Sequence, residues 1–167
     1  QDAPLSGVTL SVPLLARLAK DFPLVSYFKI ETPGTAEKLK SLIGAAGSYI
    51  DGPFDGEEGI TLFADLEAGA TGTMTSALAC EQIRPIVIDY LEGKTKHAEQ
   101  QYNKMLPLIN LENRQCGLRA SKTVFKEGGV IKSDMVRHPL EPLQMATRAV
   151  LLKMAREMEL IAIRWGI

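Results

Sequence analysis

The sequence is poor in the residues that mark several classes of protein. It has two cysteines and two histidines in 167 residues, and Cys80 and Cys116 have no CxxC spacing. We therefore expect neither a disulfide framework nor a structural zinc site, and a reducing cytoplasm is the expected compartment. The net charge is -1 and no run of basic residues is present, which argues against binding to nucleic acid.

Long apolar runs are also missing. Polar residues interrupt every apolar stretch well before the length of a bilayer span, so we expect no transmembrane helix and no membrane partner. The first residues, Gln1-Asp2-Ala3-Pro4, have neither the basic start nor the apolar core of a signal peptide, and the chain does not begin with methionine. The remaining composition, 46% hydrophobic and 23% charged, is that of an ordinary globular domain.

Short apolar segments alternate with amphipathic helices up to Gly93. Strands are expected at 25–32, 48–51 and 71–75, and helices at about 9–21, 35–46, 57–68 and 77–92. Repeated helix, turn and strand units are typical of α/β folds with a parallel sheet. After Gly93 the pattern becomes wholly helical, with helices expected at 94–110, 116–127 and 144–163.

A lysine stands in the middle of the most apolar and aromatic of these strands. Residues two apart on a strand share a face, so Tyr27, Lys29 and Glu31 point one way, and Phe28 and Ile30 point the other. Burying an ammonium is costly, and an amine in an apolar wall loses proton affinity and can attack a carbonyl to form a Schiff base. A carboxylate on the same face can then move protons. The alternative is an edge strand whose lysine reaches solvent beside a salt-bridged glutamate.

Several segments together resemble one enzyme superfamily. They are the octet around Lys29, the Asp2-Ala3-Pro4 loop, the Ala68-Gly69-Ala70-Thr71-Gly72 turn, Met105-Leu106-Pro107-Leu108 and Arg137-His138-Pro139-Leu140. This set is similar to the dihydrodipicolinate synthase / N-acetylneuraminate lyase superfamily, over the whole chain but only over the second half of such a protein. The resemblance implies strands six to eight of a (β/α)8 TIM barrel in residues 1–93, completed by the N-terminal half of the barrel, and a C-terminal helical extension in residues 94–167.

Three further motifs are most similar to the 2-keto-3-deoxy-L-arabonate dehydratases of that superfamily. They are Phe28-Lys29-Ile30-Glu31-Thr32-Pro33-Gly34, Asp51-Gly52-Pro53-Phe54-Asp55-Gly56-Glu57-Glu58 and Asn110-Leu111-Glu112-Asn113-Arg114-Gln115. The resemblance implies a hydro-lyase of pentose (L-arabinose) catabolism that removes water from a 2-keto-3-deoxy sugar acid to give 2-oxoglutarate semialdehyde. It implies a covalent Schiff base through Lys29, no metal or organic cofactor, and a homotetramer.

Two alternatives remain open. One is a class I aldolase that splits a 2-keto-3-deoxy acid to pyruvate and an aldehyde. Many superfamily members have a proton-relaying tyrosine 28 residues before the lysine, whereas this chain has Gln1, which cannot titrate. That departure counts against the aldolase. It also favours a role in proton transfer for Glu31, the titratable group on the face of Lys29. The other alternative is a non-catalytic half-barrel fragment.

In a TIM barrel the chemistry takes place at the carboxyl ends of the strands, where Lys29 and Glu31 stand. Glu31 is the candidate base, and its alternative role is a fixed counter-ion of Lys29. Four residues are candidate substrate contacts: Gln1, Gly52, Thr73 and Thr75. A simple turn glycine is the alternative for Gly52, and small barrel-filling side chains are the alternative for the two threonines. A further set, Asp55, Glu57 and Glu58, is expected to supply the acids of a helix N-terminus.

Overall fold

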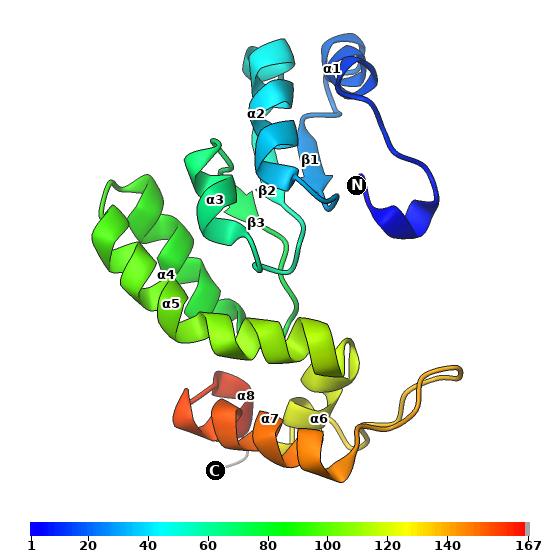
Figure 1. The fold of residues 1–167 in the computed structure, drawn as a ribbon, viewed down its shortest axis with the longest axis vertical. Helices are drawn as coiled ribbons and strands as arrows, with labels where there is room; N and C mark the ends of the chain where they lie inside the picture. Colours follow the sequence, from blue (N-terminus) through cyan, green and yellow to red (C-terminus); the bar gives the residue numbers. More distant parts are fainter. Residues whose placement is uncertain (166–167) are drawn as a thin grey trace. The chain divides into compact units, whose positions relative to one another are not determined.

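The computed structural model describes residues 1–165 and divides the chain into two compact units (Figure 1). The first comprises residues 1–75 and 87–99, and the second comprises residues 76–86 and those from 100 on. The helix α4 (Cys80–Leu91) and the helix α5 (Thr95–Leu111) each contribute residues to both units.

The first unit is built on a parallel sheet of three strands. They are β1 (Tyr27–Ile30), β2 (Gly52–Asp55) and β3 (Gly72–Thr73), hydrogen-bonded in the order β1-β2-β3. Lys29 is paired with Phe54 and Ile30 with Asp55, so each pair shares a face of the sheet. Phe28, Ile30 and Asp55 are buried, whereas Tyr27 is exposed. The face opposite Lys29 is therefore the covered one.

Helices cover that face. They are α1 (Val12–Asp21), α2 (Thr35–Ala46) and α3 (Leu62–Glu67), with short 3-10 turns at Pro4–Ser6 and Gly47–Tyr49. The helix α2 packs on β1, β2 and α1, and α3 packs on β2 (Figure 1). Their buried leucines, Leu39, Leu42, Leu62 and Leu66, form the core with the buried strand residues. Burial of this apolar surface is the main term that holds the unit together.

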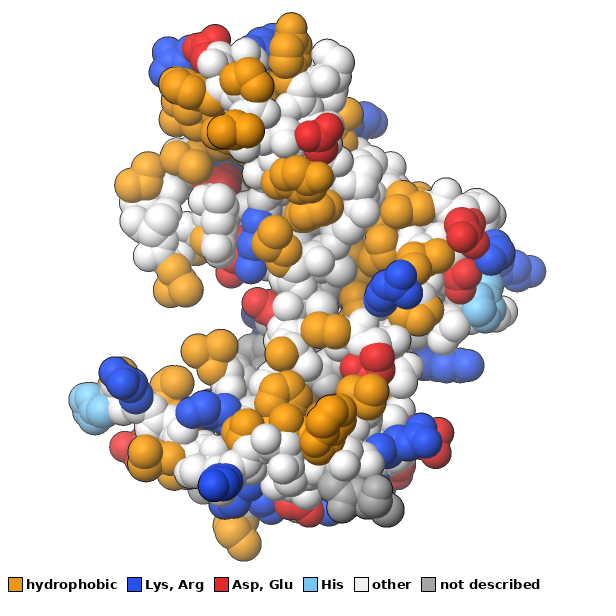
Figure 2. All heavy atoms as spheres, turned by 180° about the vertical axis from the view of Figure 1, so that it is seen from behind, with side chains coloured by type: hydrophobic (Ala, Val, Ile, Leu, Met, Phe, Trp, Pro, Cys, Tyr) orange, Lys and Arg blue, Asp and Glu red, His pale blue; other side chains and the backbone are white. Residues whose placement is uncertain are grey.

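Local signals set the ends of the first two helices. The Ser11 side chain accepts a hydrogen bond from the Leu14 amide at 3.4 Å, and α1 begins with Pro13 in its first turn. The helix α2 begins at Thr35 and is followed by Gly47, as expected. Four large apolar side chains are exposed just after α1 and at the amino end of β1: Phe22, Leu24, Val25 and Tyr27. Figure 2 shows hydrophobic side chains, in orange, on the surface of this unit.

The second unit is helical. Its elements include a π-helical turn at Glu112–Cys116, α6 (Arg119–Glu127), α7 (Met145–Glu157) and α8 (Ile161–Arg164). The helix α6 packs on α7 and α8. Glu127 at the end of α6 binds Arg148 at 3.1 Å and also pairs with Arg156, both on α7. A Cβ on Gly128 would lie 1.6 Å from the Ala162 carbonyl oxygen, so only glycine allows α6 to end against α8.

Three expected elements are wrong in their bounds. The second strand lies at 52–55 rather than 48–51. A 3-10 turn at Gly47–Tyr49 precedes it. Pro53 is tolerated in this central strand because β3 pairs only with Phe54 and Asp55, so the missing amide of Pro53 precedes that ladder. The last helix, expected over 144–163, is divided into α7 and α8, because the chain turns at Glu159, which has a φ of 51°. The helix expected from 116 begins at Arg119, after the π-helical turn.

A fourth correction concerns the acidic segment after β2. A helix was expected over 57–68, with Asp55, Glu57 and Glu58 at its N-terminus, but α3 begins only at Leu62. Glu58 and Gly59 have φ of 55° and 84°, in the left-handed region that an α-helix does not enter. The chain therefore forms a loop over residues 56–61, and the three acids lie outside the first turn of α3.

Candidate active site

Lys29 and Glu31 meet at the carboxyl end of β1. The Lys29 Nζ lies 3.4 Å from Glu31 Oε2, and their side chains are 16% and 22% exposed. The Gln1 side-chain amide donates a hydrogen bond to the same Glu31 oxygen at 2.5 Å. The geometry thus brings three predicted site residues together, with a primary amine, a carboxylate and an amide in one contact network.

A short extended segment at the start of the chain fixes this arrangement. The Asp2 amide donates to the Lys29 carbonyl at 2.9 Å, and the Glu31 amide donates to the Asp2 carbonyl at 2.8 Å. These two bonds form a parallel bridge between Asp2 and Ile30 on the free edge of β1. The Asp2 side chain is buried and pairs with Lys38 of α2, which also donates to the Leu10 carbonyl at 2.6 Å. Gln1 is therefore held beside Glu31 by backbone geometry.

Gly56 belongs to the site and was missed in the sequence. A Cβ at this position would lie 2.8 Å from Lys29 Cγ and 2.7 Å from the Ile30 carbonyl oxygen. The loop that leaves β2 can cross the stem of Lys29 only because residue 56 has no side chain. A glycine that follows a strand is a weak signal in a sequence, because most such glycines serve a turn.

Glu58 is the second residue that was missed as a site residue. Burial raises the pKa of its carboxyl, while the charge of Lys29 opposes this and the charges of Glu31 and Asp55 add to it. Its Oε2 is buried with no hydrogen-bond partner among the described residues. Glu58 is thus a carboxyl group whose burial favours the neutral acid relative to an ordinary glutamate, near an ion-paired lysine. Two carboxyls in different environments can divide the roles of acid and base in a reaction.

The remaining predicted residues lie elsewhere in the unit. Gly52 opens β2 and is paired with Tyr27, and a Cβ there would lie 2.4 Å from the Tyr27 ring, so this glycine makes room for the aromatic contact of Tyr27 with Phe54. Thr73 is paired with Asp55 on the covered face and donates to its carboxylate at 2.5 Å. Thr75 donates to the Glu58 carbonyl at 3.2 Å. Both threonine hydroxyls therefore support the acidic loop.

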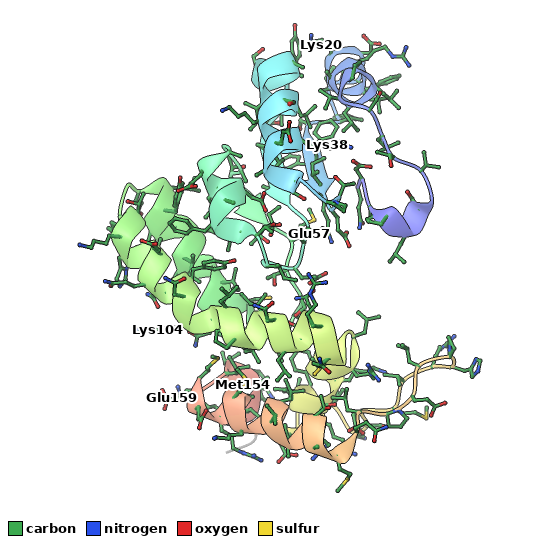
Figure 3. All side chains as sticks on the ribbon, in the orientation of Figure 1. Lys20, Lys38, Glu57, Lys104, Met154 and Glu159 are labelled. Carbon is green, nitrogen blue, oxygen red and sulfur yellow. The ribbon has the colours of Figure 1, made fainter. Side chains whose placement is uncertain are left out.

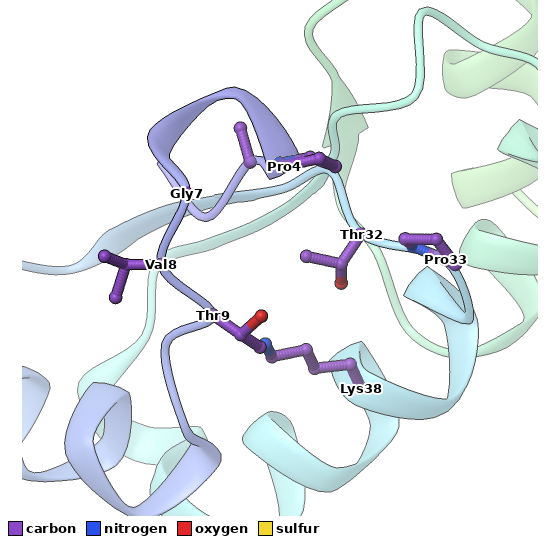
Figure 4. Close-up of a pocket in the computed structure, with 8 residues that line it drawn as sticks. Pro4, Gly7, Val8, Thr9, Thr32, Pro33 and Lys38 are labelled. Atoms are coloured by element: carbon purple, nitrogen blue, oxygen red, sulfur yellow. The ribbon is translucent and has the colours of Figure 1, made fainter.

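A separate pocket of about 520 Å³ lies beside this network (Figure 4). Its lining includes Pro4, Val8, Thr32, Pro33 and Lys38. The Lys38 ammonium in this lining is paired with Asp2 and donates to the Leu10 carbonyl. Figure 3 shows Lys38 on α2 and Glu57 in the loop after β2. The pocket lining contains neither Lys29 nor Glu31, so this pocket does not enclose the two reactive side chains.

Two absences hold for residues 1–165. Within this range no three side chains of His, Cys, Asp or Glu come together in a way that could hold a metal ion. Within the same range no helix combines the length and the apolar character needed to cross a bilayer.

Comparison with known proteins identifies relatives of this chain. The profile of the Dihydrodipicolinate synthetase family matches residues 2–158. The chain belongs to that family. Over 166 residues it is 52% identical to L-2-keto-3-deoxyarabonate dehydratase of Azospirillum brasilense, a match that covers 99% of this chain and 54% of the relative. Over 158 residues it is 27% identical to 4-hydroxy-tetrahydrodipicolinate synthase of Geotalea daltonii, covering 93% of this chain and 53% of the relative.

The solved structures of the family share the fold. Dihydrodipicolinate synthase from Rhodopseudomonas palustris superposes with a TM-score of 0.80 at 26% identity, covering 93% of this chain and 54% of that structure. The mixed α/β fold with a parallel sheet, expected from the sequence, is thereby confirmed. The chain spans about half the length of the curated relatives it matches.

Proposed function

We propose that the chain carries the Schiff-base lysine of a hydro-lyase that converts 2-keto-3-deoxy-L-arabonate to 2-oxoglutarate semialdehyde. One observation carries the proposal: Lys29 is ion-paired with Glu31 at 3.4 Å while a second carboxyl, Glu58, has its pKa raised by burial in the same surroundings. Removing water from a 2-keto acid needs an amine, a base and an acid, and these three side chains supply one of each. The 52% identity to the Azospirillum dehydratase supports this choice of substrate.

The reaction follows from these roles. The neutral Lys29 amine attacks C2 of the substrate, and loss of water leaves an iminium. The iminium withdraws electrons from C3, and we assign removal of the C3 proton to the Glu31 carboxylate. The electron pair left at C3 expels the C4 hydroxyl, which takes the proton of Glu58 and departs as water. A proton shift from C5 then forms the aldehyde through its enol, and hydrolysis of the iminium frees Lys29 and the semialdehyde.

Gln1 fits dehydration better than aldol cleavage. Aldol cleavage needs a base that takes the proton of the substrate hydroxyl, and an amide cannot do this. The Gln1 amide instead donates to Glu31 at 2.5 Å, which orients the carboxylate that acts at C3. Hydroxyls of Thr73 and Thr75, together with Gly52, remain our candidates for further substrate contacts through rearrangement of the loops that they support.

We further propose the architecture of the whole protein. The strands β1 to β3 would be strands six to eight of a (β/α)8 barrel within residues 1–93, and residues 94–167 the C-terminal helical extension. The exposed large side chains Phe22, Leu24 and Tyr27 support this, since the N-terminal half of a barrel would cover apolar surface beside β1. Assembly as a homotetramer in the cytoplasm, with no cofactor beyond the lysine, completes the proposal.

Borohydride trapping tests the proposal. The full-length protein is incubated with 2-keto-3-deoxy-L-arabonate or pyruvate, reduced, digested and examined by peptide mass spectrometry. A reduced adduct on Lys29 is expected, together with semialdehyde as the product. The Lys29→Ala variant should lose both, and Lys20→Ala, at an exposed lysine of α1, should lose neither. Trapping on another lysine, or none, would rule out the assignment of Lys29, and release of pyruvate would favour the aldolase.

A further inference from the structure

The loop that carries Glu58 has an unusual backbone conformation. Glu58 and the following Gly59 are both left-handed, with φ of 55° and 84°. Glycine adopts this conformation freely, whereas in a glutamate the Cβ atom crowds the following carbonyl, so the conformation costs free energy. Strained residues of this kind persist only where the surrounding structure holds them, and they are concentrated at functional sites. We therefore looked for the contacts that hold Glu58 in place.

Two threonines at the carboxyl end of β3 bind this loop. The Thr75 hydroxyl donates to the Glu58 carbonyl at 3.2 Å, which is a bond to the strained residue itself. Thr73 acts one residue earlier and indirectly. Its hydroxyl donates to the Asp55 carboxylate at 2.5 Å, and that carboxylate accepts the Glu57 amide at 2.9 Å. Thr75 is therefore the threonine that bears directly on the backbone of Glu58.

The loop held in this way lies against the reactive lysine. Gly56, two residues before Glu58, is so near that a Cβ there would lie 2.8 Å from Lys29 Cγ. Burial raises the pKa of the Glu58 carboxyl, and the nearby charges of Lys29 and Glu31 act on it in opposite directions. A change of φ from the left-handed to the ordinary region would turn the Cα–Cβ bond of Glu58 away from its present direction. The left-handed backbone therefore decides where this carboxyl lies.

We propose that Thr75 is a positioning residue for the dehydration step, because its hydrogen bond to the Glu58 carbonyl holds the left-handed turn that directs the Glu58 carboxyl. The inference rests on the proposed function, since it concerns the residue to which that function assigns the acid. In this role Thr75 acts through Glu58 and does not touch the substrate. A direct contact of the Thr75 hydroxyl with the substrate is the competing role, and the two roles predict different kinetics.

A double-mutant cycle of Thr75→Val and Glu58→Gln tests the inference in the full-length protein, with 2-keto-3-deoxy-L-arabonate as substrate. Valine keeps the shape of threonine but cannot donate a hydrogen bond. In Thr75→Val, kcat for dehydration should fall by about 10-fold, the effect of leaving one carbonyl without its donor. KM should stay within about twofold, because the displaced group acts in the chemical step. In the Glu58→Gln background the same change should lower kcat by less than about twofold, since the group through which Thr75 acts is already lost.

Further readouts separate positioning of the acid from general damage to the site. Thr75→Val should keep the borohydride adduct at Lys29 and exchange of the C3 protons in deuterated water, because these steps need Lys29 and Glu31 but not the acid. Thr75→Ser keeps the hydroxyl and should restore kcat to within about threefold of the wild type. Thr71→Val is the matched control, since Thr71 is an exposed threonine just before β3, and it should leave kcat unchanged.

The outcomes are distinct. Equal losses of kcat in the two backgrounds, loss of C3 exchange in Thr75→Val, or no recovery in Thr75→Ser would each overturn the inference while the proposed function stands. If Thr75→Val does not fold, Thr75→Ala completes the same cycle, and the same results decide. Failure of the proposed function shows in proteins with an intact Thr75. A wild type without an adduct at Lys29, or a Glu58→Gln variant with the wild-type kcat, would overturn the proposed function and this inference together.

Discussion

Replacing Gly56 by alanine is the sharpest test of the site geometry. The added Cβ would lie 2.7 Å from the Ile30 carbonyl oxygen and 2.8 Å from Lys29 Cγ, whereas ordinary contacts begin at 3.4 Å. The Ile30 carbonyl belongs to the β1 backbone and cannot rotate away as a flexible side-chain end can. The loop must therefore withdraw from β1 by about 0.7 Å, the difference between the two distances.

This displacement has two expected effects. Forcing an extra methyl group into a packed site costs about 1–3 kcal/mol of unfolding free energy. It also moves the loop that carries Glu58 away from Lys29, and a misplacement of about 1 Å in an active site can cost about 100-fold in rate. We expect kcat for dehydration to fall between about 10-fold and 100-fold, with a small change in KM, because the groups displaced act in the chemical step.

Steady-state kinetics and urea unfolding of the full-length protein measure the two effects. Gly44→Ala is the matched control: Gly44 is exposed within α2, and a Cβ there meets nothing within 4 Å. That variant should keep kcat and gain up to about 1 kcal/mol in stability, since alanine is the better helix former. A Gly56→Ala variant with kcat within about twofold of the wild type would refute the close approach of the loop to Lys29, or the reactivity of Lys29.

Two other perturbations probe separate parts of the unit. Glu58→Gln should keep borohydride trapping at Lys29 and exchange of the C3 protons in deuterated water. It should lower the rate of dehydration by about 100-fold or more, because only the departure of the C4 hydroxyl needs an acid. Loss of C3 proton exchange in this variant, measured by NMR, would contradict the assignment of Glu58. Since burial raises the pKa of Glu58, the acid form is present at low pH and is lost as pH rises through that value, so this variant should also lack the corresponding decline in kcat. Lys38→Met leaves the buried Asp2 carboxylate without its cation and should lower the free energy of unfolding, measured in urea, by about 3–5 kcal/mol. Lys40→Met changes an exposed lysine of the same helix and should have little effect on that free energy. Equal effects of the two changes would show that the ion pair of Lys38 with Asp2 does not stabilise the fold.

The helix ends that were predicted well depend on short-range chemistry. Ser11 caps α1 and Gly47 follows α2 as the sequence indicates, because a cap or a helix stop involves residues within one turn of one another. The shared face of Lys29 and Glu31 is equally local, since the side-chain period of a strand does not depend on its neighbours. The 3.4 Å ion pair at the end of β1 was therefore within reach of sequence reasoning.

The acidic segment after β2 shows where that reasoning ends. A run of acids before an apolar helix is typical of a helix N-terminus, and Glu57 and Glu58 fit the pattern. The structure instead gives Glu58 a φ of 55° and delays α3 to Leu62, so that the run becomes a loop over the carboxyl end of β1. Nothing in the residue types distinguishes these two outcomes, because the choice depends on what β1 and β3 offer to the loop.

The sequence by itself determined the chemistry that this protein has available: an amine and a carboxylate on one face of an apolar strand, a glutamine where a tyrosine relay is common, and the alternation of strands and helices that stacks them at a sheet edge. Tertiary structure alone decided which other groups join them. It selected Gly56 by the 2.8 Å approach to Lys29 Cγ, and it raised the pKa values of Glu58 and Asp65 by burial. The physical reason is that proton affinity and close approach depend on atoms distant in the chain, whereas strand period and helix caps depend on neighbours within it.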